Sequence, residues 1–385
     1  MKKISVLLLS AALIMLCANV ALSEVGVSDT EIVLGMSNAQ TGPASGLGKG
    51  MLTGADAFFK ELNDKGGIHG RKIKLVVKDD GYEPEKAIDS TLTLIEDEKV
   101  FALFGYVGTP TANAVIPLVK DAKIPLVGLF TGAMTLRTPV TKEIINVRAS
   151  YDDETEVLVD RFIKDTGAKK FAVLYQNDGF GLAVLSGTEK ALKKRGMEVV
   201  GKGSFQRNTV AINEGFTAVK EANPDAVVLV GPYTPIAAIV KLAKQEKLPA
   251  KLATVSFVGT DNLVSAVGGD GDGVVISQVV PFPEDTAIPV VKECQDAVKK
   301  HYPDQKLGFI NLEGCMTAKV LALGLEKTGK DLTREGLIRT FENMKDIDAG
   351  GAVVNMSGED HQALGDIFLT QIKDGRIMQI MTIGK

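Results

Sequence analysis

Hydrophobic and polar positions alternate along the chain with two periods, one typical of buried strands and the other of amphipathic helices. Residues 32–36 form a short apolar run that predicts a strand, and residues 51–62 repeat apolar side chains at helical spacing. The unit recurs, with further strands expected at 72–77, 100–104 and 124–128 and helices at 84–96 and 110–121. Strands that are apolar nearly throughout, separated by helices, predict a parallel sheet covered on both faces.

A second series with the same rhythm follows residues 144–149. Its expected strands are 171–175, 198–204, 226–230, 252–257 and 273–280, and its expected helices are 154–165, 180–195, 211–222 and 235–245. Three helices at 287–301, 312–328 and 334–343 come next, and Asp374-Gly375 predicts the turn of a C-terminal hairpin. The late helical block indicates that the chain returns to the first unit. The pattern therefore predicts an α/β protein with two lobes.

The first 23 residues have the features of a secretory signal peptide. Lys2 and Lys3 precede an apolar run, and the small residues Ala21 and Ser23 stand at the positions that signal peptidase reads. Leu16 is too bulky for lipoprotein processing at Cys17, and the run is too short to span a bilayer. We expect cleavage after Ser23, an exported protein and no stable membrane insertion.

Composition narrows the class of function. No acid lies among the first 23 residues, so loss of Lys2 and Lys3 changes the formal charge from -4 to -6, which argues against nucleic acid as a partner. A chain of 385 residues is also too long for one core, in agreement with two lobes.

Motifs for metal, phosphate or catalysis are missing from the sequence. The histidines His69, His301 and His361 are far apart and form no short metal-ligand pattern, so we expect no metal and no cofactor. Gly50 stands where a phosphate loop needs Ser or Thr, and no Gly-x-Ser-x-Gly elbow occurs. We expect no catalytic residues.

Two cysteines, Cys294 and Cys315, follow the expected cleavage site. In an oxidising compartment they can form a disulfide between two helices of the late block. The alternative is that both are small buried hydrophobic residues with free thiols.

Two loops that carry hydroxyl groups follow consecutive strands of the first series. Thr109 is the expected N-cap of a helix that begins at Pro110, and Thr131 lies in the next loop between Phe130 and Gly132. Helix N–H groups and hydroxyls at the carboxyl ends of parallel strands form a site for a carboxylate or phosphate. The alternative is an ordinary capped helix. In the second series, Phe180 stands at a comparable helix start.

The order and spacing of several segments resemble the leucine/isoleucine/valine-binding protein family of periplasmic receptors, over almost the whole mature chain. The segments are Ile32-Val33-Leu34-Gly35, Thr41-Gly42-Pro43, Gly66 to Ile73, Asp80 with Pro84 to Ala87, Gly105 to Thr111, Ile124 to Gly128 and Leu312-Glu313-Gly314.

This resemblance implies the type I periplasmic binding fold, in which two Rossmann-like lobes are joined by three hinge crossings and enclose an interlobe cleft. The expected first lobe is 30–147 plus 283–354, and the expected second lobe is 148–282 plus 355–385.

The resemblance also implies a set of ligand-binding positions, with Thr109 as the carboxylate binder. The set is Thr109, Phe130, Thr131, Gly132, Phe180, Tyr233, Ser256, Phe309 and Leu47. Relatives that bind α-amino acids usually carry an acidic residue near Ser256 to pair with the ammonium group. A buried ammonium needs a negative or carbonyl partner, and Asp261 or Glu313 would have to serve instead.

The implied function is that of the periplasmic solute-binding component of an ABC importer. By hinge closure it would bind a small carboxylate, a branched-chain or other apolar amino acid, and present it to an inner-membrane ABC permease. Two alternatives stay open, namely a ligand that is an apolar or aromatic carboxylic acid without the amine, and a sensory receptor of the same fold.

Overall fold

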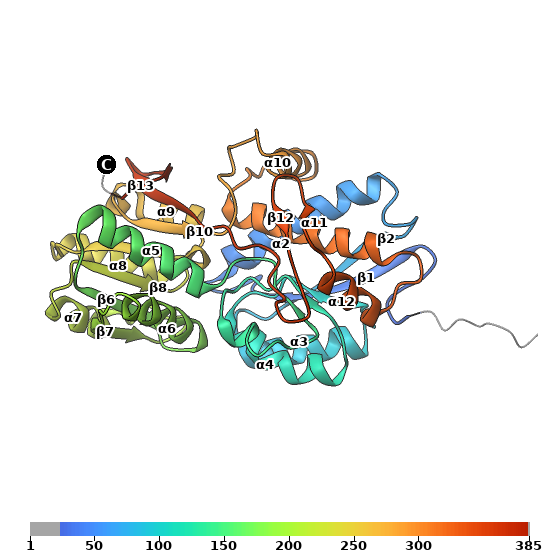
Figure 1. Ribbon diagram of the computed structural model, residues 1–385, viewed down its shortest axis with the longest axis horizontal. Helices are drawn as coiled ribbons and strands as arrows, with labels where there is room; N and C mark the ends of the chain where they lie inside the picture. Colours follow the sequence, from blue (N-terminus) through green and yellow to red (C-terminus); the bar gives the residue numbers. More distant parts are fainter. Residues whose placement is uncertain (1–23, 384–385) are drawn as a thin grey trace, which may run out of the picture.

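The computed structural model describes residues 24–383, so the expected signal peptide lies outside the described residues. The chain forms two lobes that lie end to end (Figure 1), each built on a sheet with helices on both faces. Among the helices of residues 24–383, none is long and apolar enough to cross a membrane.

The first lobe contains a five-stranded parallel sheet in the order β2-β1-β3-β4-β5. Its strands are β1 (Glu31–Asn38), β2 (Lys72–Asp79), β3 (Ala102–Phe104), β4 (Leu126–Val127) and β5 (Ile144–Ile145). Its helices are α2 (Ser45–Asp64), α3 (Pro84–Glu96) and α4 (Thr109–Asp121). Because all five strands run in one direction, the loops after β3 and β4 meet at the same edge.

The second lobe contains a seven-stranded sheet in the order β14-β13-β10-β9-β8-β6-β7. Its strands are β6 (Phe171–Gln176), β7 (Val199–Phe205), β8 (Ala226–Val230), β9 (Lys251–Thr254), β10 (Val275–Gln278), β13 (Phe368–Lys373) and β14 (Arg376–Ile380). Its helices are α5 (Tyr151–Thr166), α6 (Gly179–Lys193), α7 (Asn213–Glu221), α8 (Tyr233–Gln245) and α9 (Thr260–Val267). The strand expected at 252–257 ends at Thr254, because residues 256–258 turn as a 3-10 helix that leads into α9.

The late helical block returns to the first lobe, as the sequence predicts. It consists of α10 (Pro289–His301), α11 (Phe309–Thr328) and α12 (Arg334–Glu342), followed by the short strands β11 (Ile347–Asp348) and β12 (Val353–Val354). Its buried apolar residues share one core with β1 and α2. The chain therefore crosses between the lobes three times: from β5 to α5, from β10 to α10, and from β12 to β13.

Backbone hydrogen bonds after β12 indicate where the third crossing begins. Asn146 donates its backbone N–H to the carbonyl of His361 at 2.8 Å, and Leu364 donates to the carbonyl of Val147 at 2.9 Å. These bonds lay residues 361–364 beside the end of the first sheet. We therefore propose that the second lobe resumes after Leu364 rather than at residue 355.

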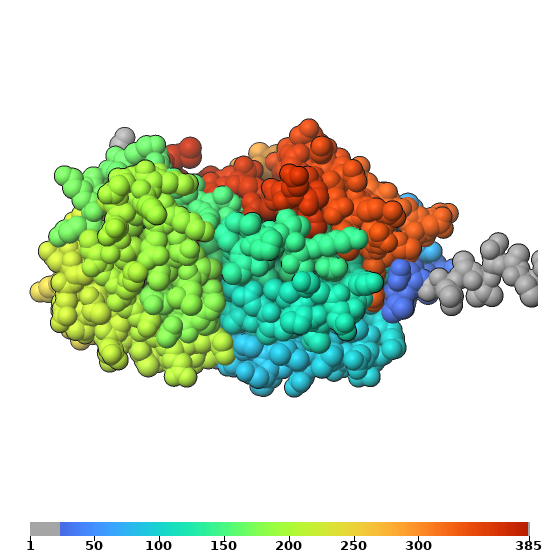
Figure 2. Space-filling model, turned by 60° about the horizontal axis from the view of Figure 1, so that its bottom comes forward, coloured from blue at the N-terminus to red at the C-terminus, as the bar shows by residue number. Residues whose placement is uncertain are grey.

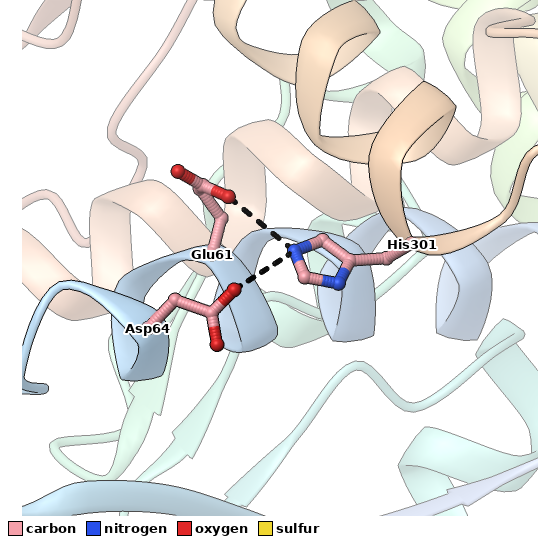
Figure 3. Close-up of side chains that lie close together, drawn as sticks. All are labelled: Glu61, Asp64 and His301. Atoms are coloured by element: carbon pink, nitrogen blue, oxygen red, sulfur yellow. Dashed lines mark hydrogen bonds and ion pairs between the residues drawn. The ribbon is translucent and has the colours of Figure 1, made fainter.

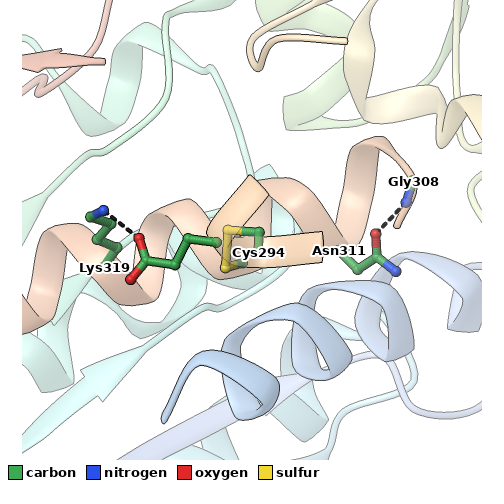
Figure 4. The surroundings of a disulfide bond; sticks show 6 residues. Cys294, Gly308, Asn311 and Lys319 are labelled. Carbon is green, nitrogen blue, oxygen red and sulfur yellow. Dashed lines mark hydrogen bonds and ion pairs between the residues drawn. A yellow bond between two sulfur atoms is a disulfide. The ribbon is translucent and has the colours of Figure 1, made fainter. Parts of the chain in front are cut away.

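A disulfide joins the two longest helices of the late block. Cys294 of α10 is bonded to Cys315 of α11, with their Cα atoms 5.9 Å apart and both side chains buried. Beside it, Lys319 forms an ion pair with Glu293, linking the same two helices (Figure 4). The structure thus has the first of the two alternatives left open for these cysteines, and the bond fixes α10 against α11.

Candidate ligand site between the lobes

Loops at the carboxyl ends of both sheets meet between the lobes. The first lobe contributes Thr109 after β3 and Phe130 after β4, and the second contributes Phe180 after β6 and Phe257 after β9. Phe130, Phe180 and Phe257 belong to one buried hydrophobic cluster that is continuous across the lobes. In the space-filling view the two lobes touch closely along their junction (Figure 2).

Two threonine hydroxyls form the polar centre of this junction. Thr109 Oγ1 lies 2.6 Å from Thr131 Oγ1, and both side chains are fully buried. The expectation that Thr109 caps α4 is wrong, because Gly108 is the N-cap and Thr109 the first helical residue. Gly108 has φ 100, and a Cβ there would lie 2.1 Å from the Tyr82 ring, so only glycine fits. The Thr109 hydroxyl is thus free to face the neighbouring loop.

Aromatic rings from both lobes surround the hydroxyl pair. The ring of Phe257 lies 4.5 Å from that of Phe180, 5.4 Å from that of Phe130 and 6.1 Å from that of Tyr82. These separations suit offset and tilted aromatic contacts. The sequence did not single out Phe257 or Tyr82. The available signal was that Phe257 follows Ser256, a position in the expected set.

Tyr151, at the start of α5, adds a buried hydroxyl that the sequence analysis missed. Its ring lies 5.3 Å from that of Phe180, and its N–H donates to the Gly132 carbonyl at 2.7 Å. A Cβ on Gly132 would lie 2.5 Å from the Tyr151 nitrogen, which explains the glycine. Burial raises the pKa of Tyr151, so the hydroxyl stays protonated beside Thr131. No residue in the described part of the chain completes a well-aligned hydrogen bond with it.

A buried guanidinium, that of Arg148, connects the two lobes next to these aromatic rings. Arg148 lies 2.9 Å from the carboxylate of Glu154 and 3.3 Å from that of Glu313, and it also donates to the hydroxyl of Ser256. Its guanidinium stands 5.2 Å from the ring centre of Phe130. Such stacking is a favourable cation–π arrangement.

The two carboxylates around Arg148 differ in their surroundings. Glu154 accepts hydrogen bonds from the Ser256 nitrogen at 2.8 Å and from the Ser277 hydroxyl at 2.6 Å. Burial raises the pKa of Glu313 to about 7, although the positive charge of Arg148 opposes the rise. Glu154 therefore occupies the surroundings of Ser256, where relatives are expected to carry an acid, and the sequence analysis did not identify it.

The remaining expected positions form contacts at the edge of the junction. The Tyr233 hydroxyl accepts from the Gly46 nitrogen at 3.2 Å, and Asp261 accepts from the Phe309 nitrogen at 2.9 Å. The Leu47 side chain packs against Gly259 of the second lobe, so closely that a Cβ on this glycine would lie 2.6 Å from it. The Phe309 ring belongs to the core of the first lobe, 5.7 Å from that of Phe282.

Further polar contacts also join the lobes. Glu83 of the first lobe accepts from Arg207 at 2.7 Å and from Asn208 at 2.6 Å. With these contacts and the shared hydrophobic cluster between them, the lobes stand in a closed arrangement.

The structure thus gathers most of the expected set around one centre. The expected residues that lie around the hydroxyl pair and Arg148 are Thr109, Phe130, Thr131, Gly132, Phe180, Ser256 and Glu313. Those that join the lobes further out are Leu47, Tyr233, Asp261 and Phe309.

Two α/β lobes, three crossings and a buried site at the facing carboxyl ends of two sheets define a two-lobed solute-binding protein of the type I periplasmic class. A family model described as periplasmic binding protein matches residues 31–376. The chain belongs to this family, so the resemblance and the fold expected from the sequence are confirmed.

Individual relatives agree with this assignment. An "Amino acid binding protein" of Pseudomonas aeruginosa is 24% identical over 239 residues, which cover 62% of this chain and 64% of that protein. "Leu/Ile/Val-binding protein homolog 7" of Brucella suis is 25% identical over 328 residues, 82% of each chain. The crystal structure of a possible leucine/isoleucine/valine-binding protein from Rhodopirellula baltica superposes with a TM-score of 0.87 at 31% identity, covering 91% of this chain and 96% of that one.

Proposed function

We propose that this protein is the periplasmic solute-binding component of an ABC importer. It closes its lobes around a small carboxylate, a branched-chain or other apolar amino acid, and presents it unchanged to an inner-membrane permease. The observation that carries the proposal is the buried hydroxyl pair of Thr109, at the start of α4, and Thr131, with the Tyr151 hydroxyl beside it. Hydroxyls and helix N–H groups are donors, which a carboxylate requires.

The walls around these donors favour an apolar ligand. Phe130 comes from the first lobe, and Phe180 and Phe257 come from the second. A ligand held by Thr109 and Thr131 would therefore contact apolar rings of both lobes. Closure of the lobes would bury those contacts, and the differential affinity for the closed form is what drives a hinge movement.

The hydroxyl pair is tested by Thr109→Val and Thr131→Val. Each variant keeps the shape of the side chain but removes one hydrogen bond to a charged ligand. We expect each to weaken ligand binding by about 1–3 kcal/mol, measured by calorimetry. Thr188→Val is a matched control, because the Thr188 hydroxyl is buried but donates within its own helix to the Val184 carbonyl. Unchanged affinity in both site variants would remove the carboxylate assignment.

The charge around Arg148 favours a ligand that carries an ammonium group. Two carboxyls, those of Glu154 and Glu313, share this one guanidinium, and burial, together with the negative charge of Glu154, raises the pKa of Glu313. An ammonium group bound nearby would supply the missing charge. Glu154 and Glu313 then take the part that an acid at Ser256 plays in relatives.

The amine is tested by comparing leucine with 4-methylpentanoate, which differs only by lacking that group. We expect leucine to bind about tenfold or more tightly, because hydrogen-bonded charge pairs of this kind contribute 1.5 kcal/mol or more. Glu313→Gln should weaken leucine binding more than 4-methylpentanoate binding. If the amine-free acid binds as tightly as leucine, the ligand is instead an apolar or aromatic carboxylic acid, and the binding-protein assignment stands.

A further inference from the structure

Three potential metal ligands lie together where α2 meets α10, on the outer side of the first lobe (Figure 3). Glu61 and Asp64 are one turn apart on α2, and His301 is the last residue of α10. Glu61 stands 14 residues beyond Leu47 on the same helix, or about 20 Å from the junction of the lobes at 1.5 Å per residue. The cluster is therefore separate from the ligand site.

The three donor atoms lie within 4.8 Å of one another, and the two distances from the imidazole are close to those of a tetrahedral zinc site. His301 Nε2 lies 3.3 Å from Glu61 Oε2 and 3.9 Å from Asp64 Oδ2. Metal–ligand bonds of about 2.1 Å in a tetrahedron place ligand atoms about 3.4 Å apart. Small side-chain rotations would thus be enough to bring all three atoms onto one ion.

The scaffold under the cluster holds the two helices in place. Ala57 of α2 packs against Ala297 and Val298 of α10 in a small buried cluster. The disulfide fixes α10 to α11, and α11 approaches α2 so closely that a Cβ on Gly54 would lie 1.7 Å from a carbonyl oxygen of α11. A site whose ligands come from rigid elements needs little ordering when the ion binds.

The cluster already holds a cation, the ammonium group of Lys300. Its Nζ lies 2.7 Å from Glu61 Oε2 and 2.8 Å from Asp64 Oδ2. The Lys300 side chain is 52% exposed, and surface pairs of this kind contribute at most about 1 kcal/mol. Lys300 can therefore swing into water and leave Glu61 Oε2 and Asp64 Oδ2 to a stronger cation, while Lys65 stays 3.2 Å from the other Glu61 oxygen.

We propose that Glu61, Asp64 and His301 bind one Zn²⁺ ion, which displaces Lys300 and joins α2 to α10. One imidazole and two carboxylates, with water in the fourth position, form a ligand set that suits Zn²⁺. Ca²⁺ is not expected to bind, because it requires six or more oxygen ligands. The sequence analysis expected no metal because no histidine lies in a short metal-ligand pattern. The ligands proposed here come from segments more than 230 residues apart, which such a pattern does not detect.

The test is calorimetric titration of the purified, untagged and metal-free protein with zinc chloride, and in parallel with calcium chloride. We expect one Zn²⁺ per chain, a rise in melting temperature with Zn²⁺, and no response to Ca²⁺. His301→Gln should weaken Zn²⁺ binding about 100-fold, since it removes a direct ligand. Lys300→Gln should strengthen it, because the competing ammonium is gone.

His69→Gln is the matched control. His69 is an exposed histidine whose Nε2 lies 2.9 Å from the Glu326 carbonyl, and the variant should bind Zn²⁺ as the unchanged protein does. Melting temperatures without metal would verify that each variant is folded. The proposal is overturned if the unchanged protein does not bind Zn²⁺, if His301→Gln binds it equally well, or if Lys300→Gln binds it more weakly.

Discussion

Replacing Arg148 by Met is expected to lower the free energy of unfolding by about 3–5 kcal/mol, since it leaves buried carboxyls without their positive partner. Glu154 is fully buried and Glu313 nearly so, and both are ion-paired with this guanidinium. The two hydroxyl bonds and one N–H bond that also hold Glu154 cannot replace the lost charge. Urea denaturation followed by circular dichroism measures the change.

The destabilisation should grow as the pH rises. Burial already raises the pKa of Glu313 from 4.5 to about 7, and loss of Arg148 removes the charge that opposes this rise. An acid whose folded-state pKa lies above its unfolded value contributes stability below the unfolded pKa and loses it as the pH rises through the folded pKa. We therefore expect Arg148→Met to be less harmful at pH 5 than at pH 8.

A variant without the buried charges is the control for this prediction. Arg148→Met combined with Glu154→Gln and Glu313→Gln removes the carboxylates as well, so no unpaired ion stays buried and part of the lost stability should return. If Arg148→Met costs less than about 1 kcal/mol at pH 8, the three groups do not form the ion pairs described here.

Removing the disulfide, by Cys294→Ala together with Cys315→Ala, is expected to cost about 3 kcal/mol of unfolding free energy. The bond closes a loop between cysteines 21 positions apart, and a loop of that length restricts the unfolded chain by about this amount. A lower melting temperature of the double variant, measured by calorimetry, is the expected result.

Chemical reduction separates the bond from the side chains. The reduced protein with both cysteines should have a melting temperature close to that of the double variant, because both lack the cross-link. Any difference between the two melting temperatures measures the effect of the sulfur atoms themselves. Free thiols in the unreduced, denatured protein would contradict the pairing, and Cys294 and Cys315 would then be the buried hydrophobic residues of the alternative interpretation.

Many helices and strands could be predicted from the sequence, because secondary structure depends largely on residues that are close together in the chain. The helix 84–96 and the strand 226–230 were predicted with the bounds that the structure has. Pro84 begins the first, and five consecutive apolar residues define the second. The strand 252–257 was predicted too long, because an apolar run does not distinguish a strand from the 3-10 turn at 256–258.

The meeting of the two threonine hydroxyls could also be predicted, since it follows from one rule of parallel sheets. Thr109 and Thr131 follow consecutive strands, and the carboxyl ends of parallel strands share an edge, so the two hydroxyls had to lie close together. The capping role expected for Thr109 was wrong, because the conformation of Gly108 decides where α4 begins.

Only the tertiary structure decided which distant residues join these threonines. Arg148, Glu154 and Glu313 are spread over 166 positions and meet because three crossings bring the lobes together. Tyr82 and Phe257 come into contact for the same reason, and Glu61 meets His301 through the packing of α10 on α2. Hydrophobic period and turn chemistry are set by residues a few positions apart, so the sequence determined the elements, the two lobes and the hydroxyl loops. The pairing of buried charges and rings depends on where whole lobes pack, which no local pattern contains.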